Sequence, residues 1–266
     1  MNQLIVLGTG NALATECYNT CYLIEEQGEH IMVDAGGGNG ILVQMKRGNI
    51  DFASVRHLII THEHSDHVLG VVWVFRKIAT MMKKGQYEGE FHMWCHEELA
   101  VMIRQLLEMT LQQKFIRLIG ERILIHPVVD GEQANLLWNK VTFFDIHSTK
   151  AKQFAFTIED SEKKVVFLGD EPYNELCEPY VGNAKWLLCE AFCLYEERDI
   201  FEPYEKHHVT VKEACELAEK MKVANLVLWH TEDKNYHNRK ELYGREGAYY
   251  YSGNLLIPND LEIISL

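Results

Sequence analysis

The chain has 266 residues, 47% of them hydrophobic and 24% charged, a balance typical of a globular protein with a sizeable core. The formal net charge of −13 argues against an extended surface that binds nucleic-acid phosphates, because an acidic surface repels polyanions. A local cationic site could still bind a small anion. No stretch approaches about eighteen consecutive apolar residues, and no basic region of a signal peptide opens the chain. We therefore expect a cytoplasmic protein with free cysteines and no membrane association.

Strands and helices interleave along the chain without a regular strand–helix–strand alternation. Apolar, β-branched segments bounded by turn residues predict strands over 3–8, 20–26, 30–36, 55–61, 90–96, 121–128, 140–149, 153–160, 163–170, 185–192 and 224–230. Apolar positions at helical spacing predict helices over 41–48, 68–84, 97–119 and 210–223. Thr210 and Glu213 form the sequence pattern of a capping box at the start of the last helix.

This pattern predicts an α/β fold made of two mixed sheets with helices packed outside. No linker or low-complexity segment divides the chain, so we expect one domain over residues 1–266. A helical cover is expected at about residues 71–119. Its part from 98 to 119 is rich in Leu, Ile and Met, which is typical of a core or covering helix; a dimer face or a substrate lid is the alternative.

The stretch IITHEHSDHVLG, residues 59–70, concentrates metal-ligand side chains where a buried strand should end. His62 and His64 point the same way if the strand continues, because residues two apart share a face. Asp66 and His67 follow where the next helix would start. Imidazole nitrogen and carboxylate oxygen are ligands that zinc prefers, and the two pairs suit two metals about 3.5–4 Å apart. A solvated loop is the alternative, but the H-x-H-x-D-H register favours a metal site.

Two metals need further ligands, and three later segments can supply them. His147, Asp170 and His230 each stand at the end of an apolar run. A buried ionisable group is costly unless it is paired or binds metal. We therefore predict that these three residues complete a set of seven ligands.

The order of these motifs resembles that of the metallo-β-lactamase superfamily over nearly the whole chain. LGTGNA, VDAGGG and the stretch from His207 to His230 resemble the ribonuclease Z branch. The resemblance implies a four-layered αβ/βα sandwich with two zinc ions at the sheet edge, with Mn²⁺ or iron as other possible metals. By that analogy, each zinc has three ligands of its own and one residue bridges them: His62, His64 and His147 for one, Asp66, His67 and His230 for the other, and Asp170 as the bridge.

The same resemblance assigns catalytic roles. His208 matches the position of a non-ligand histidine near the scissile phosphate, and Glu190 matches the acidic residue that orients it. A carboxylate-oriented imidazole can protonate a leaving oxygen or bind a phosphoryl oxygen. We count Asp66 with them as a catalytic residue. A surface histidine at a helix N-terminus is the alternative interpretation of His208.

The chain departs from the tRNA-processing enzymes of that branch in two respects. Only 22 residues separate His147 from Asp170, which leaves no room for the long tRNA-binding arm, and Glu171 stands where Thr is usual. We therefore expect a small-molecule or nucleotide-like substrate, no extended tRNA binding, and a homodimer as one possible assembly.

The leading hypothesis is a dinuclear zinc hydrolase, a phosphodiesterase in which a metal-bridging hydroxide attacks phosphorus and His208 assists the leaving group. Hydrolysis of a carboxylic or sulfuric ester at the same site is an alternative. A non-hydrolytic di-iron redox or sensor protein is another, but the chain holds no flavodoxin or rubredoxin module that such proteins usually carry.

Overall fold

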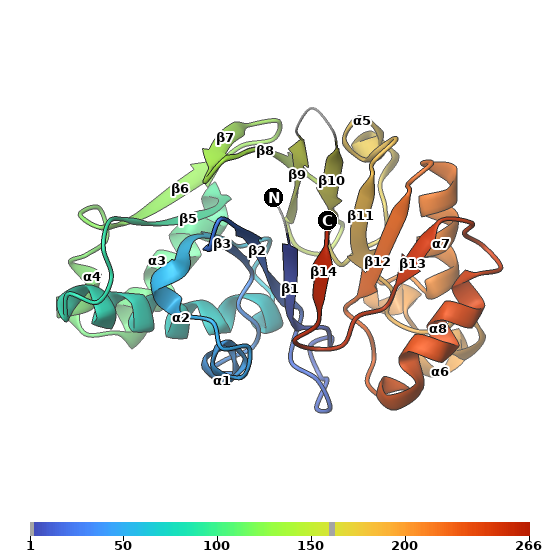
Figure 1. Ribbon diagram of the computed structural model, residues 1–266, viewed down its shortest axis with the longest axis horizontal. Helices are drawn as coiled ribbons and strands as arrows, with labels where there is room; N and C mark the ends of the chain where they lie inside the picture. The colour runs from blue at the N-terminus through green and yellow to red at the C-terminus, as the bar shows by residue number, and fades with distance from the viewer. Residues whose placement is uncertain (1–2, 160–162) are drawn as a thin grey trace.

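The structure, a computed structural model, describes residues 3–159 and 163–266. Two seven-stranded sheets lie face to face, and helices cover the outer face of each (Figure 1). One hydrophobic cluster lies between the sheets, and it combines side chains such as Val6 and Ile31 from the first with Phe167 and Trp229 from the second. Two further clusters lie outside the sheets: one packs the first sheet against its helices, and the other packs the second sheet against its helices. The predicted four-layered sandwich is therefore confirmed.

The first sheet combines an antiparallel and a parallel half. Its strands, in spatial order, are β14 (Ile263–Ser265), β1 (Gln3–Gly8), β2 (Cys21–Glu26), β3 (Glu29–Val33), β4 (Val55–Ile59), β5 (Phe91–His96) and β6 (Ile123–Val128). Strands β3 to β6 run parallel to one another, so their carboxyl ends meet at one edge.

The second sheet also combines antiparallel and parallel strands. Its strands, in spatial order, are β13 (Asn254–Leu256), β12 (Asn225–Trp229), β11 (Trp186–Glu190), β10 (Lys164–Phe167), β9 (Phe154–Glu159), β8 (Asn139–Asp145) and β7 (Gln133–Leu136). Strands β10 to β13 are parallel, and their carboxyl ends also gather at one edge. The end of the predicted strand over 153–160 falls at residue 160, outside the described residues.

Helices from the first half of the chain cover the first sheet, and those from the second half flank the other (Figure 1). The α-helices are α1 (Gly40–Arg47), α2 (Ser65–Lys83), α3 (Glu97–Thr110), α4 (Gln113–Ile116), α5 (Glu178–Val181), α6 (Arg198–Phe201), α7 (Val211–Lys220) and α8 (Arg239–Gly247). Short 3₁₀ turns cover Phe52–Ser54, Glu175–Cys177, Tyr195–Glu197, Tyr204–Lys206 and Tyr236–Asn238. None of the helices in the described ranges is long and apolar enough to cross a membrane.

Three predicted helices differ in their limits, and the last of them, expected over 210–223, ends at Lys220. The helix expected over 97–119 is interrupted, because Leu111 takes an extended conformation with φ −117° and ψ 155° and separates α3 from α4. Helix α2 starts at Ser65 rather than at residue 68, so Asp66 and His67 lie in its first turn. The capping box of Thr210 and Glu213 is present at the start of α7, as predicted.

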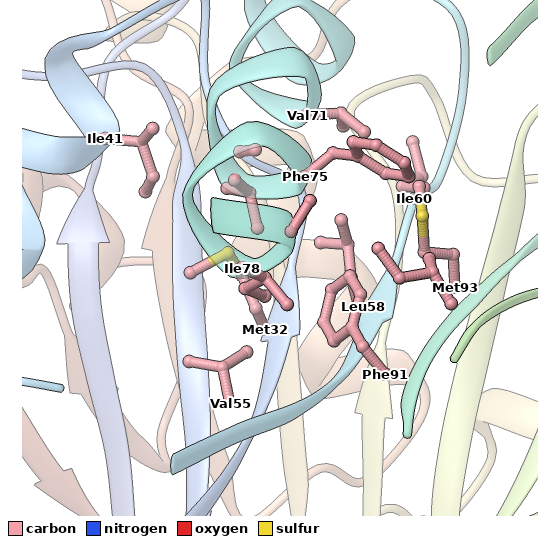
Figure 2. Close-up of a cluster of buried hydrophobic side chains, with 14 of the residues drawn as sticks. Met32, Ile41, Val55, Leu58, Ile60, Val71, Phe75, Ile78, Phe91 and Met93 are labelled. Atoms are coloured by element: carbon pink, nitrogen blue, oxygen red, sulfur yellow. The ribbon is translucent and has the colours of Figure 1, made fainter. Parts of the chain in front are cut away.

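Helix α2 is fixed by its packing against the first sheet. Val71, Phe75 and Ile78 lie on the side of α2 that faces Leu58 of β4 and Phe91 of β5 (Figure 2), and all five side chains are fully buried. Burial of such a side chain contributes about 1.5–3 kcal/mol. This packing holds the first turn of α2 at the edge of the sheet.

Gly70 allows α2 to approach the loop after β3. Its amide donates to the carbonyl oxygen of Gly36 at 2.7 Å, and a Cβ at this position would collide with the backbone oxygen of Ala35. Replacing Gly by Ala inside a helix normally stabilises it by about 1 kcal/mol. Here the collision is with backbone, which cannot rotate away, so the steric cost exceeds the gain in helix propensity.

We predict that Gly70→Ala lowers the free energy of unfolding by about 1–3 kcal/mol, the usual cost of overpacking. Urea denaturation of the metal-free protein measures it. Gly38→Ala is the matched control, because a Cβ there meets nothing within 4 Å. A Gly70→Ala protein as stable as the wild type would contradict this account of the helix contact.

Candidate metal centre

The candidate ligands gather where the carboxyl ends of strands from both sheets meet. His62 follows β4, Asp170 follows β10 and His230 follows β12. Asp66 and His67 reach the same place from the first turn of α2. Polar groups at the carboxyl ends of parallel strands commonly form ligand sites. Residues far apart in the sequence thus meet in one buried group.

The ligand atoms form two overlapping sets. The nitrogen and oxygen atoms of His62, His67 and Asp170 lie within 4.8 Å of one another, and so do those of Asp66, His67 and His230. Asp170 faces both sets: its Oδ1 is 3.6 Å from Nε2 of His62, and its Oδ2 is 3.3 Å from Nε2 of His230. The position of Asp170 therefore suits a ligand shared between two ions.

His64 and His147 differ in their placement. Nδ1 of His64 lies 2.8 Å from Nε2 of His62, so His64 joins the group. His147 has an exposed side chain, and its backbone turns sharply with φ +57° while its amide donates to Asp145 Oδ1 at 2.7 Å. It belongs to neither set of clustered ligand atoms. The structure thus departs from the expected first ligand set, and the role of His147 stays a prediction.

The carboxylates and imidazoles of this group shift one another's pKa strongly. Burial raises the pKa of Asp170, but the imidazoles of His62, His230 and His67 outweigh burial and hold that pKa well below its usual range. Burial lowers the pKa of His230, but Asp170, Asp66 and Glu190 outweigh it and raise the pKa to about 10. The carboxylates are therefore held in their ionised form, which is the form that binds metal.

One buried nitrogen fits a metal directly. Nε2 of His67 has no hydrogen-bond partner although its residue is 3% exposed, and it points at oxygens of Asp66 and Asp170, each at 3.4 Å. An unsatisfied buried polar atom costs about 1–3 kcal/mol. A divalent cation between this nitrogen and the two carboxylates would satisfy it, and the nitrogen and oxygen ligands suit zinc.

Asp34 holds two of the candidate ligand histidines in place, a role that the sequence analysis did not predict. Its Oδ2 accepts hydrogen bonds from His67 Nδ1 and Thr61 Oγ1, each at 2.8 Å. Thr61 Oγ1 in turn lies 2.9 Å from Nδ1 of His62. A carboxylate that binds Nδ1–H leaves Nε2 free to face a metal. The only sequence signal was an aspartate after an apolar strand, in VDAGGG.

His208 and Glu190 lie together beside the ligands. Nδ1 of His208 is 2.7 Å from Glu190 Oε2 and 3.0 Å from the carbonyl oxygen of Asp170. Because both partners are acceptors, Nδ1 carries the proton and Nε2 remains for other contacts. Phe192 stacks on the imidazole, with the ring centroids 4.8 Å apart, and Glu190 Oε2 also lies 3.5 Å from Nδ1 of His230. Glu190 therefore orients His208 and also contacts the candidate ligand His230.

A cavity of about 340 Å³ opens in front of this group. Its wall includes the candidate ligands His64, Asp66, Asp170 and His230, the candidate acid His208, and also Asn11, Ala12, Leu13, Ser65, Lys150, Phe192 and Lys206. The loop after β1 thus borders the site through Asn11, Ala12 and Leu13. A volume of this size suits a small ligand.

Comparison with known proteins agrees with the fold. Ribonuclease Z of Thermococcus onnurineus is 24% identical over 313 residues, covering 100% of this chain and 95% of that protein. The metallo-β-lactamase fold protein YhfI of Bacillus subtilis superposes with a TM-score of 0.80 at 18% identity, covering 100% and 99% of the two chains. The short form of human tRNase Z gives 0.77 at 17% identity, covering 99% and 98%.

The chain thus has the metallo-β-lactamase fold, and its full-length similarity to ribonuclease Z supports the predicted class of metal-dependent hydrolase. A family model described as "Anti-Pycsar protein Apyc1" matches residues 2–248. The chain belongs to that family.

The contact between Asp34 and His67 gives a prediction about metal affinity. Asp34→Asn keeps the size of the side chain but removes its charge, so His67 loses its charged acceptor. Loss of such an outer partner typically weakens metal binding about 10–100-fold. Competition with a chromogenic chelator measures it, with Asp51→Asn, an exposed aspartate outside the site, as the control. Unchanged affinity in Asp34→Asn would contradict the positioning role.

Proposed function

We propose that this protein is a dinuclear zinc phosphodiesterase that acts on a small, anionic, nucleotide-like phosphodiester. The observation that most supports a phosphodiesterase is the pairing of His208 with Glu190 at 2.7 Å, on the wall of a cavity that also holds the candidate metal ligands. A site that only binds metal would need no histidine and glutamate paired in this way.

The metal would be held by the clustered histidines and aspartates, with Asp170 shared between two ions. Zinc fits this mixture of nitrogen and oxygen ligands best, and Mn²⁺ or iron could replace it. When bound, such metals supply Lewis acidity and a water of lowered pKa. Asp66 and Asp170 neutralise part of the metal charge. Asp34 binds Nδ1 of His67, which leaves Nε2 as the atom that would bind a metal.

His208 supplies the proton that bond cleavage requires. Hydrolysis joins a water oxygen to phosphorus and breaks the bond to the leaving oxygen, which must then be protonated. Glu190 accepts from Nδ1–H of His208 and orients the ring, so Nε2, when it carries a proton, can donate it to the leaving oxygen. Stacking against Phe192 holds the ring plane. The pair thus acts on the leaving group while the ligands hold the metal.

The charge and size of the cavity favour a small anion. Lys150 and Lys206 border the cavity although the chain as a whole carries a net charge of −13. This local positive charge would attract a phosphodiester. The cavity of about 340 Å³ suits a ligand of nucleotide size, whereas a whole tRNA would need a basic surface beyond it. Ribonuclease Z-like relatives support phosphodiester chemistry but not tRNA as the substrate here.

Replacing His208 tests this proposal. We predict that His208→Ala folds normally and keeps its metal, because other residues hold it, but loses about 10²–10⁴-fold in turnover of a diester with a poor leaving group. Turnover of bis(p-nitrophenyl) phosphate should fall much less, because nitrophenolate needs little protonation. Steady-state kinetics on both substrates, with metal analysis of each variant, measures the difference.

His207→Ala is the matched control, since His207 lies next to His208 but bonds to Thr149 Oγ1 at 2.9 Å and is not part of the cavity wall. Loss of metal in His208→Ala, or wild-type turnover of the poor-leaving-group diester, would refute the assigned role. Faster turnover of aryl sulfates or carboxylic esters than of any diester would favour ester hydrolysis instead.

A further inference from the structure

Gln153 is a buried polar residue that the proposed mechanism does not use. It directly precedes β9 and is only 2% exposed. Its Nε2 donates a hydrogen bond to Oδ1 of Asp170 at 2.6 Å. Because an ionised carboxylate can only accept hydrogen bonds, the nitrogen of the amide is the atom that must face it. This contact joins the residue that would be shared between two ions to a second segment of the chain.

The other half of the Gln153 amide is unsatisfied. Among the residues that the structure describes, Oε1 of Gln153 is buried without a hydrogen-bond partner. A buried polar atom without a partner costs about 1–3 kcal/mol, and an apolar side chain of similar size, such as that of methionine, would avoid this cost. The benefit of glutamine at this position therefore lies in its nitrogen, the atom that contacts Asp170.

The backbone on both sides of Gln153 is bound to the first sheet. His96, at the end of β5, donates from Nε2 to the carbonyl oxygen of Lys152 at 3.1 Å. The amide of Phe154 donates to the carbonyl oxygen of Thr61, after β4, at 3.1 Å. Residues 152–154 therefore connect the two sheets beside the candidate ligands, and these contacts limit where the side chain of Gln153 can reach.

Gly169 makes room for this amide. A Cβ at position 169 would collide with Nε2 and Cδ of Gln153. The backbone of Gly169 does not have a positive φ, so its conformation alone does not require glycine. The close approach of the Gln153 side chain is what excludes a larger residue directly before Asp170.

From these contacts we propose that Gln153 is a positioning residue of the metal centre, whose amide holds the Asp170 carboxylate with one oxygen toward His62 and the other toward His230. Those oxygens lie 3.6 Å and 3.3 Å from the Nε2 atoms of the two histidines. A carboxylate has about four lone-pair positions, so Oδ1 can accept from Gln153 and still bind a metal. Hydrogen bonds of this kind orient ligating carboxylates. The inference rests on the proposed metal site but not on phosphodiesterase activity.

Gln153→Met tests the proposal, because it keeps the approximate size of the side chain and removes the donor. We expect the affinity for Zn²⁺, measured by competition with a chromogenic chelator, to fall about 10–100-fold. Gln133→Met is the matched control, since Gln133 is exposed and its amide donates to Thr142 Oγ1 at 3.3 Å; its zinc affinity should equal that of the wild type. Urea denaturation of the metal-free variants separates positioning from a purely structural role: lower stability of Gln153→Met with unchanged zinc affinity would overturn the proposal.

Gly169→Ala provides a second test if Gln153→Met does not fold. Its Cβ displaces the amide of Gln153, which is the mobile end of a flexible side chain, so zinc affinity should again fall about tenfold or more. In Gln153→Ala no amide remains to be displaced, so adding Gly169→Ala to that variant should weaken zinc binding little further, because both changes remove the same contact.

Fully additive losses in the double variant, or wild-type zinc affinity in Gly169→Ala, would overturn the assignment. A wild-type protein that binds zinc while Gln153→Met binds it equally well contradicts only this inference. A wild-type protein that binds no zinc would contradict the proposed function as well.

Discussion

Asp66 and Asp170 are buried carboxylates, and the architecture of the site depends on what balances their charge. Both are almost inaccessible to solvent, at 5% and 6% exposure. An unpaired buried charge is destabilising by several kcal/mol. The imidazoles of His62, His67 and His230 lie within 3.6 Å of their oxygens, yet Nε2 of His67 still lacks a hydrogen-bond partner. A bound cation would balance the charge and satisfy Nε2 of His67 at once.

The fold brings the groups that surround these two carboxylates from separate segments of the chain to one edge of the sheets. Parallel strands in both sheets end together, and α2 begins at the same place because its apolar side packs on the first sheet. Asp34 then sets the tautomer of His67 from the end of β3, and Glu190 does the same for His208 from the end of β11. The groups that would bind metal and the group that would donate a proton are each oriented by a buried carboxylate.

The sequence predicts most of this arrangement for identifiable reasons. H-x-H-x-D-H lies within six residues, so local geometry alone brings its members together. Asp170 and His230 follow apolar strands, and parallel strands carry such ends to a common edge. The fold class follows from the same pattern and from the resemblance to a known superfamily.

Other features depend on three-dimensional context that the sequence pattern does not encode. Asp34 has no spacing signal that separates it from any strand-end aspartate. Leu111 continues the apolar pattern of its helix, so the break at that residue was missed. The direction of His147 depends on one backbone turn with positive φ. Strands β7, β13 and β14 span only three or four residues, too few for periodicity to be visible.

The number of metal ions bound per chain tests the central claim most directly. Inductively coupled plasma mass spectrometry of protein purified without added chelator, combined with thermal unfolding before and after removal of metal, gives both the stoichiometry and the contribution to stability. The account predicts two transition-metal ions per chain, mostly zinc, and a lower melting temperature once they are removed, because binding to the folded state alone stabilises it. A metal-free protein with an unchanged melting temperature and full hydrolytic activity would contradict it.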